Sequence, residues 1–187
     1  HHLSEITEAL VNFYEEPDEM HALIDQIVDY ELRLADMHIK YVKPDALFHH
    51  DDWGTQISTF LAPEMFEEFL LEPYKRIYGY WRDHGVELIV HHSDSFGETL
   101  VPFMVEMGVD IWQGTLRTTN DIPALIDRFG GQIAFMGGIE SQIVDKPDWT
   151  REEVRAEVDA AIAAAGRPTG FIPWLTSVLD SSGYPGM

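Results

Sequence analysis

Apolar residues along the chain follow two different spacings. Short, nearly continuous apolar runs alternate with longer stretches in which apolar residues recur every three or four positions. The runs have the character of β-strands, and the stretches have the periodicity of amphipathic α-helices. Strands are predicted at 46–50, 86–92, 109–113, 132–137 and 170–174. Helices are predicted at 3–15, 18–42, 63–84, 97–107, 120–129 and 151–165.

Turn and capping residues mark the ends of these elements. Gly85, Gly108 and Gly166 each follow a helical stretch, where glycine commonly ends a helix. Thr150, with Glu153 three residues later, has the pattern of a capping box at the start of the last helix. The boundaries therefore agree with the periodicity.

Strands that alternate with helices predict a parallel sheet with crossover helices. Strands this apolar are typical of a sheet that is buried on both faces. An open doubly wound sheet and a piece of a barrel both fit this order, but no GxGxxG turn follows the first strand, as a nucleotide-binding doubly wound sheet would require. Five strands are fewer than the eight of a complete barrel. We therefore expect an α/β fold that is a partial (β/α)8 TIM barrel of about five parallel strands, forming a single domain over residues 3–187.

Composition narrows the range of partners and of site chemistry. The chain has 12 basic and 33 acidic residues, a formal charge of −21, which disfavours nucleic acids and anionic membrane surfaces. No apolar run is long enough to span a membrane, and no export signal is apparent, so a cytoplasmic location is expected. His1 and His2 are interpreted as the remnant of a tag. The absence of cysteine excludes disulfides, thiolate nucleophiles and cysteine-ligated zinc.

Polar and aromatic residues gather where the predicted strands end. Because the carboxyl ends of parallel strands converge, we expect these residues to share one rim of the sheet. They are His49, His50, Asp51, Asp52, Trp53 and Gln56 after the first strand, His91, His92, Ser93 and Asp94 after the second, then Gln113, Glu140 and Trp174.

Alternation along a strand separates neighbouring residues at this rim. One of His91 and His92 is expected to pack against a helix, whereas His92 and Asp94 can share a face. A His-x-Asp pair fits a metal site, an acid/base pair or a helix cap with Asp94 as the N-cap, and these three readings remain open. Asp51 and Asp52 also face opposite ways, and an inward Asp52 is a candidate base or substrate anchor.

Five further residues are candidate substrate contacts. Aromatic side chains at the rim can grip a flat or apolar ligand, although burial in the core explains a tryptophan equally well. Polar side chains at the same rim can fix the orientation of a ligand. The five are Trp53, Gln56, Gln113, Glu140 and Trp174.

Several blocks resemble the uroporphyrinogen decarboxylase superfamily. They are DDWGTQ, LAPEMFEEFLLEPYKRIYGYWRDHGVELIVHHSD, EMGVDIWQG and IAFMGGIESQIV, within a resemblance that extends over about residues 17–186. The superfamily includes the decarboxylase of haem synthesis and methyltransferases that depend on cobalamin or coenzyme M. The resemblance implies a barrel of about twice this length, of which this chain is the C-terminal part.

The two branches of the superfamily imply different sites. In the methyltransferase branch, a His-x-Cys pair and a later cysteine bind zinc. His92-Ser93-Asp94 occupies the His-x-Cys position, and the later cysteine falls near Trp174. A thiolate site is therefore excluded, and the resemblance leaves open a site for a divalent metal such as zinc, held by His92 and Asp94 with or without a further Asp or Glu.

The decarboxylase branch uses no cofactor. The resemblance places its essential aspartate in a part of the barrel that precedes this chain, and its late Gly-His-Gly turn is absent from PWLTSVLDSSG. Clustered acids at the rim also suit a polycarboxylate tetrapyrrole poorly, because like charges repel.

Three hypotheses follow from the resemblance and the rim residues. The first is a methyltransferase- or demethylase-like enzyme that moves a methyl group from a small substrate to a corrinoid protein. In it, Asp52 and His50 would orient or polarise the substrate, and His92 and Asp94 would hold a metal or a proton. The alternative is uroporphyrinogen III decarboxylase, a lyase of porphyrin biosynthesis. The third is a non-catalytic module that binds a tetrapyrrole or a corrinoid. We also expect a homo-oligomer, because a partial barrel leaves two strand edges unpaired, and we expect this part of the barrel to be inactive alone.

Overall fold

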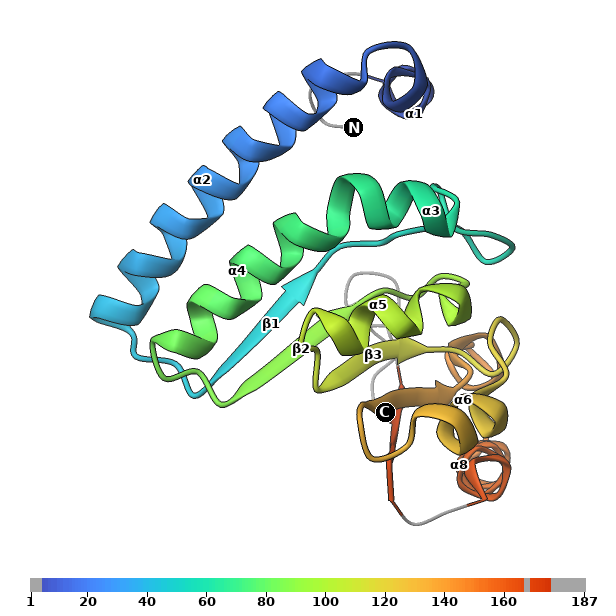
Figure 1. Ribbon diagram of the computed structural model, residues 1–187. Coiled ribbons are helices and arrows are strands. Elements are labelled where there is room, and N and C mark those ends of the chain that lie inside the picture. The colour runs from blue at the N-terminus through green and yellow to red at the C-terminus, as the bar shows by residue number, and fades with distance from the viewer. Residues whose placement is uncertain (1–4, 167–168, 176–187) are drawn as a thin grey trace.

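Five parallel strands form one sheet in the computed structural model, which describes residues 5–166 and 169–175 (Figure 1). The strands are ordered β1-β2-β3-β4-β5, and every neighbouring pair is parallel. They are β1 (Ala46–His50), β2 (Leu88–His92), β3 (Ile111–Thr115), β4 (Ala134–Ile139) and β5 (Phe171–Leu175). The prediction of five parallel strands in an α/β fold is confirmed. The end of the predicted domain, residues 176–187, lies outside the described residues.

Helices join successive strands, and α2 runs alongside α4 (Figure 1). They are α1 (Ile6–Glu15), α2 (Pro17–Tyr41), α3 (Pro63–Phe66), the π-helical turn η1 (Glu67–Leu71), α4 (Glu72–Asp83), the 3₁₀ turn η2 (Glu98–Leu100), α5 (Val101–Glu106), α6 (Ile122–Phe129), α7 (Ser141–Val144) and α8 (Arg151–Ala165). The helix predicted at 63–84 is thus one helical run interrupted by η1. The capping box of Thr150 and Glu153 is present at the start of α8.

The two faces of the sheet differ in burial. Ile89, Trp112 and Phe135 are completely buried in the core that the sheet forms with the helices. On the opposite, inner face, Phe48, Leu88 and Trp174 are 57%, 45% and 47% exposed. The expectation that the strands are buried on both faces is therefore wrong for the described part of the chain. The helices cover only one face, and five strands do not close into a barrel that would cover the other.

Strand register brings the predicted rim residues side by side. His50 is paired with His92 across β1 and β2, and His92 is paired with Gln113 across β2 and β3. Beyond the strands, the backbone N–H of Ser93 donates to the carbonyl of Gln113 over 3.0 Å. Gly114 has φ +95°, and a side chain there would meet the carbonyl oxygen of Ser93 at 2.8 Å. The close approach of these two strand ends thus requires glycine.

Candidate functional site

His50, Asp52 and His92 form a compact cluster at the carboxyl ends of β1 and β2. One nitrogen or oxygen from each side chain lies within 4.8 Å of those of the other two. The imidazole rings of His50 and His92 stack with centroids 4.2 Å apart, and His92 Nε2 lies 3.9 Å from Asp52 Oδ1. His92 is buried, Asp52 keeps 40% of its side-chain surface exposed, and His50 is exposed. The cluster is therefore anchored in the sheet and open to solvent on one side.

Gln113 holds His92 from the neighbouring strand. Its side-chain oxygen Oε1 is hydrogen-bonded to His92 Nδ1, and both residues are buried. An amide oxygen can only accept, so Nδ1 carries the proton. The lone pair of the neutral ring then lies on Nε2, which is the nitrogen nearest Asp52. Gln113 was predicted as a substrate contact, and the structure places it against His92.

Asp94 contributes its backbone to the cluster. Its N–H donates to Asp52 Oδ1 over 3.1 Å, and its carbonyl accepts from Gln56 Nε2 over 3.0 Å. Gln56 Oε1 in turn accepts from the hydroxyl of Thr119 over 3.1 Å. The loops after β1, β2 and β3 are thereby tied together. The reading of Asp94 as a helix N-cap is wrong, because Gly97 occupies that position at η2. Its carboxylate is not in the described cluster, and the pairing of His92 with Asp94 as metal ligands stays a prediction.

His91 and Asp51 face the helices, as the alternation along the strands predicts. The hydroxyl of Tyr78 lies 2.7 Å from His91 Nδ1, and His91 Nε2 lies 3.1 Å from the Asp51 carbonyl. Burial lowers the pKa of His91 well below its usual value, so the ring is neutral at pH 7. Tyr74 donates to the carboxylate of Asp51. His91, Tyr74 and Tyr78 therefore form a buried polar network on the far side of the sheet from the cluster, and the exposed Asp51 lies at its edge.

The other predicted substrate contacts have different surroundings. Trp53 is 5% exposed, its indole N–H donates to Tyr74 over 2.9 Å, and its ring stacks on His91. Glu140 is buried and accepts from the backbone and the hydroxyl of Thr118. Trp174 lies on β5, with nearly half its surface exposed. The described contacts of Trp53 and Glu140 thus brace the fold.

His49 is the residue of this region that was given no role from the sequence. Its Nδ1 is buried and has no partner among the described residues, and burial lowers its pKa. The HH pair at the end of β1 was the available signal, since alternation sends one of the two rings into the core.

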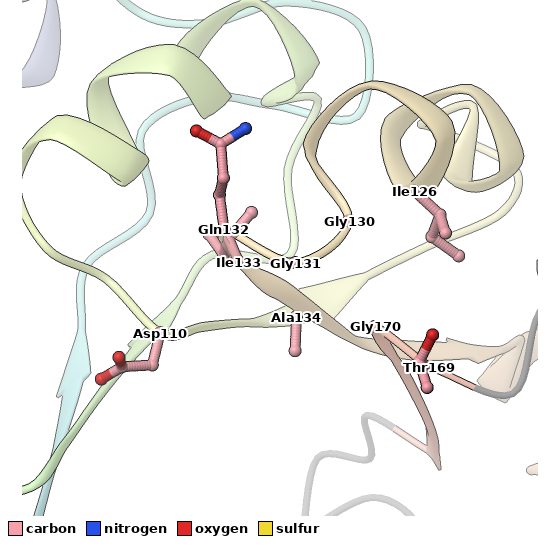
Figure 2. A pocket seen from close by; sticks show the side chains of 9 residues that line it. All are labelled: Asp110, Ile126, Gly130, Gly131, Gln132, Ile133, Ala134, Thr169 and Gly170. Carbon is pink, nitrogen blue, oxygen red and sulfur yellow. The ribbon is translucent and has the colours of Figure 1, made fainter.

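The cavity shown in Figure 2 lies at the other end of the sheet. It has a volume of about 370 Å³, and Gln132, Ala134 and Gly170 line it where β4 and β5 begin. Its charged side chain, Asp110, is paired with Arg82 and also accepts from the backbone N–H of Ile89. Because that carboxylate is committed to holding strands together, the cluster at the opposite rim is the better candidate site.

A family model named uroporphyrinogen decarboxylase (URO-D) matches residues 3–175, most of the chain. The chain belongs to the uroporphyrinogen decarboxylase family. The matched range contains all five strands and the three residues of the cluster. The resemblance noted from the sequence blocks is therefore confirmed.

A solved structure supports the barrel architecture of this family member. A methyltransferase from Methanosarcina mazei matches with a TM-score of 0.75 at 12% identity, over 98% of this chain and 50% of the other. The chain thus spans about half the length of that protein, and the prediction of a partial barrel is confirmed. No curated protein matches the sequence significantly. Among the described residues, no helix is long and apolar enough to cross a membrane.

Proposed function

We propose that this chain carries the reaction centre of a methyltransferase- or demethylase-like enzyme. A methyl group would pass from a small substrate to a corrinoid held by a partner protein. The family, the partial barrel and the methyltransferase of the same fold support the reaction class. The observation that carries the proposal is the cluster of His50, Asp52 and His92 at the carboxyl ends of the strands, where barrel enzymes hold their substrates.

The donor set of the cluster fits a divalent metal such as zinc. Two imidazoles and a carboxylate are a ligand set of open catalytic sites, which leave a coordination position for the substrate. A tetrahedral ion with bonds of about 2.0–2.2 Å holds its ligand atoms roughly 3.3–3.6 Å apart. The 3.9 Å between His92 Nε2 and Asp52 Oδ1 is close to this spacing and too long for a direct hydrogen bond. This spacing is therefore compatible with a shared ion.

A bound metal would act as a Lewis acid on the heteroatom that carries the methyl group. In the transfer, the bond between the methyl carbon and this heteroatom would break with its electron pair left on the heteroatom, and a corrinoid in its reduced, nucleophilic state would supply the electron pair for the new bond to the methyl carbon. His50 and Asp52 would orient the substrate at the open side of the cluster. Gln113 keeps His92 Nε2 directed toward that position.

Charge argues for a small substrate over uroporphyrinogen. Asp52 belongs to the cluster, the backbone N–H of Asp94 donates to it, and the whole chain carries a formal charge of −21. A substrate with several carboxylates would meet repulsion here unless cations intervened. A small neutral or cationic methyl donor would not be repelled by these carboxylates.

The test is turnover by the complete protein that contains this chain, because the chain spans half of the related barrel. Methyl transfer from a panel of small methylated donors to a corrinoid protein is expected, with a loss of at least 100-fold in Asp52→Asn. Decarboxylation of uroporphyrinogen would contradict the proposal in favour of the lyase. Binding of a corrinoid or a porphyrin without any turnover would contradict it in favour of a non-catalytic module.

A further inference from the structure

A second feature of the rim is an apolar pocket beneath α1. It has a volume of about 180 Å³ and lies between α1 and the segment that follows β1. Its walls include Ile6, Leu10 and Phe13 from α1 and Leu61 and Phe66 from the opposite side. Asp52, a member of the cluster, is also part of its lining. Asp52 is therefore shared between the pocket and the candidate active site.

Helix α1 turns an apolar stripe toward this pocket. Ile6, Leu10 and Phe13 recur at the spacing of one helix face, as in a helix that packs on a core. None of them is buried, however, and Ile6 is 45% exposed. The helix is held at its far end, where Phe13 packs edge-on against Phe69 with ring centroids 4.9 Å apart. The stripe is thus half covered, because a pocket and not a packed core lies beneath it.

The charged residues of the lining are Asp51 and Asp52. The Asp51 carboxylate accepts from Tyr74, and Asp52 Oδ1 accepts from the N–H of Asp94. Asp52 keeps 40% of its side-chain surface exposed. A ligand in this pocket would therefore contact hydrocarbon over most of its surface and two carboxylates that each already accept one hydrogen bond, of which Asp52 also belongs to the cluster.

We propose that the pocket beneath α1 binds a compact apolar group, about the size of one aromatic ring, with a hydrogen-bond donor or a cation directed at Asp52. The volume supports this size, since an apolar cavity of about 150 Å³ is known to hold benzene. The proposal deepens the proposed function and rests on it for one point, that the bound group belongs to the substrate. The substrate class would then be a small methylated molecule built on a single ring or a branched aliphatic group of equal size.

Binding of simple probes tests the pocket without any turnover. Benzyl alcohol and toluene are titrated into protein with ¹³C-labelled Ile and Leu methyl groups, and the shifts are followed by NMR. Saturable shifts at Ile6, Leu10 and Leu61 are expected for both probes, with benzyl alcohol the tighter of the two. In Asp52→Asn, the preference for the alcohol should fall at least threefold.

Filling the pocket provides a second test. Ala9→Phe, in the lining, should weaken the binding of both probes at least tenfold. Ala22→Phe, on the exposed surface of α2, is the matched control and should leave probe binding unchanged. Leu10→Trp is a second filling variant if Ala9→Phe does not fold by circular dichroism. Absence of saturable shifts in the unmodified protein, or equal binding in folded filling variants, would overturn the inference.

Failure of this inference can be told apart from failure of the proposed function. Zinc binding and methyl transfer without probe binding would refute the inference about the pocket and keep the proposed function. Saturable probe binding that is lost in Ala9→Phe, in a protein that transfers no methyl group, would support the pocket and refute the proposed function.

Discussion

At the scale of single residues, the site depends on which atom of each side chain is already engaged. His92 uses Nδ1 for Gln113 and leaves Nε2 toward Asp52, and Asp52 uses one oxygen for the N–H of Asp94. Both groups are thereby held in place while keeping ligand capacity. Such supporting hydrogen bonds orient metal ligands and contribute to affinity.

Replacing Gln113 tests this orienting role. Gln113→Leu removes the acceptor for Nδ1–H, so zinc affinity should fall about 10–100-fold, as is usual for such supporting partners. Gln113→Glu restores an acceptor and should keep the affinity within a few-fold. ¹⁵N chemical shifts of the zinc-free protein at pH 8 should show His92 protonated on Nδ1 in the unmodified chain and a mixture of tautomers in Gln113→Leu. An unchanged tautomer in that variant would refute the role.

The buried ring of His91 predicts a pH dependence of stability. Burial lowers its folded-state pKa, whereas the unfolded value is near 6.5, so the unfolded chain takes up protons first as pH falls. The contribution to stability is complete above about pH 6.5 and is lost as pH falls toward the folded-state pKa. Urea unfolding of the zinc-free protein from pH 7.5 to 5.5 should show this loss. His91→Phe should give a shallower slope, and the exposed-site variant His84→Gln should keep the original slope.

At the scale of elements, the periodicity of the sequence predicts most of the fold, because each strand and helix buries one consistent set of apolar residues. It does not predict η1, since residues 67–71 have the same apolar spacing in an α- or a π-helical turn. It also misses α7, one short turn between β4 and α8. The rim location of His50, Asp52 and His92 follows from strand order. The partner of Gln113 does not, because it depends on the register of β2 against β3.

The capping box of α8 is a local feature that the sequence does predict. The hydroxyl of Thr150 accepts from the N–H of Glu153, and the Glu153 carboxylate accepts from the N–H of Thr150. Thr150→Ala should lower the free energy of unfolding by about 1 kcal/mol, measured by urea denaturation. Thr150→Ser keeps the acceptor and should remain within about 0.5 kcal/mol of the original chain. Equal losses in both variants would mean that the methyl group, and not the cap, stabilises the helix end.

At the scale of the whole molecule, the described chain is a sheet with one open face. Helices cover the outer face, while Phe48 and Trp174 remain about half exposed on the inner one. Strands β1 and β5 each pair with one neighbour, so each has an unpaired edge within the described residues. Apolar faces and free strand edges promote association.

We therefore predict that the 187-residue chain, produced on its own, forms dimers or larger assemblies at micromolar concentration. Phe48→Lys places a charge on the inner face and should shift light-scattering mass toward the monomer. Ile57→Lys, at an 87% exposed loop position, is the matched control and should leave association unchanged. A monomeric unmodified chain at all concentrations would refute the prediction.

Zinc titration calorimetry with metal-free protein tests the central claim most directly, that side chains from two strand ends form one metal-binding centre. The account predicts one site per chain, with affinity lowered at least 100-fold in Asp52→Ala and in His92→Ala and clearly weakened in His50→Ala. Asp127→Ala, which removes a carboxylate on α6, is the control and should leave the zinc affinity unchanged. Zinc binding that is equally strong in Asp52→Ala and His92→Ala, or no stoichiometric binding in the unmodified chain, would contradict the account.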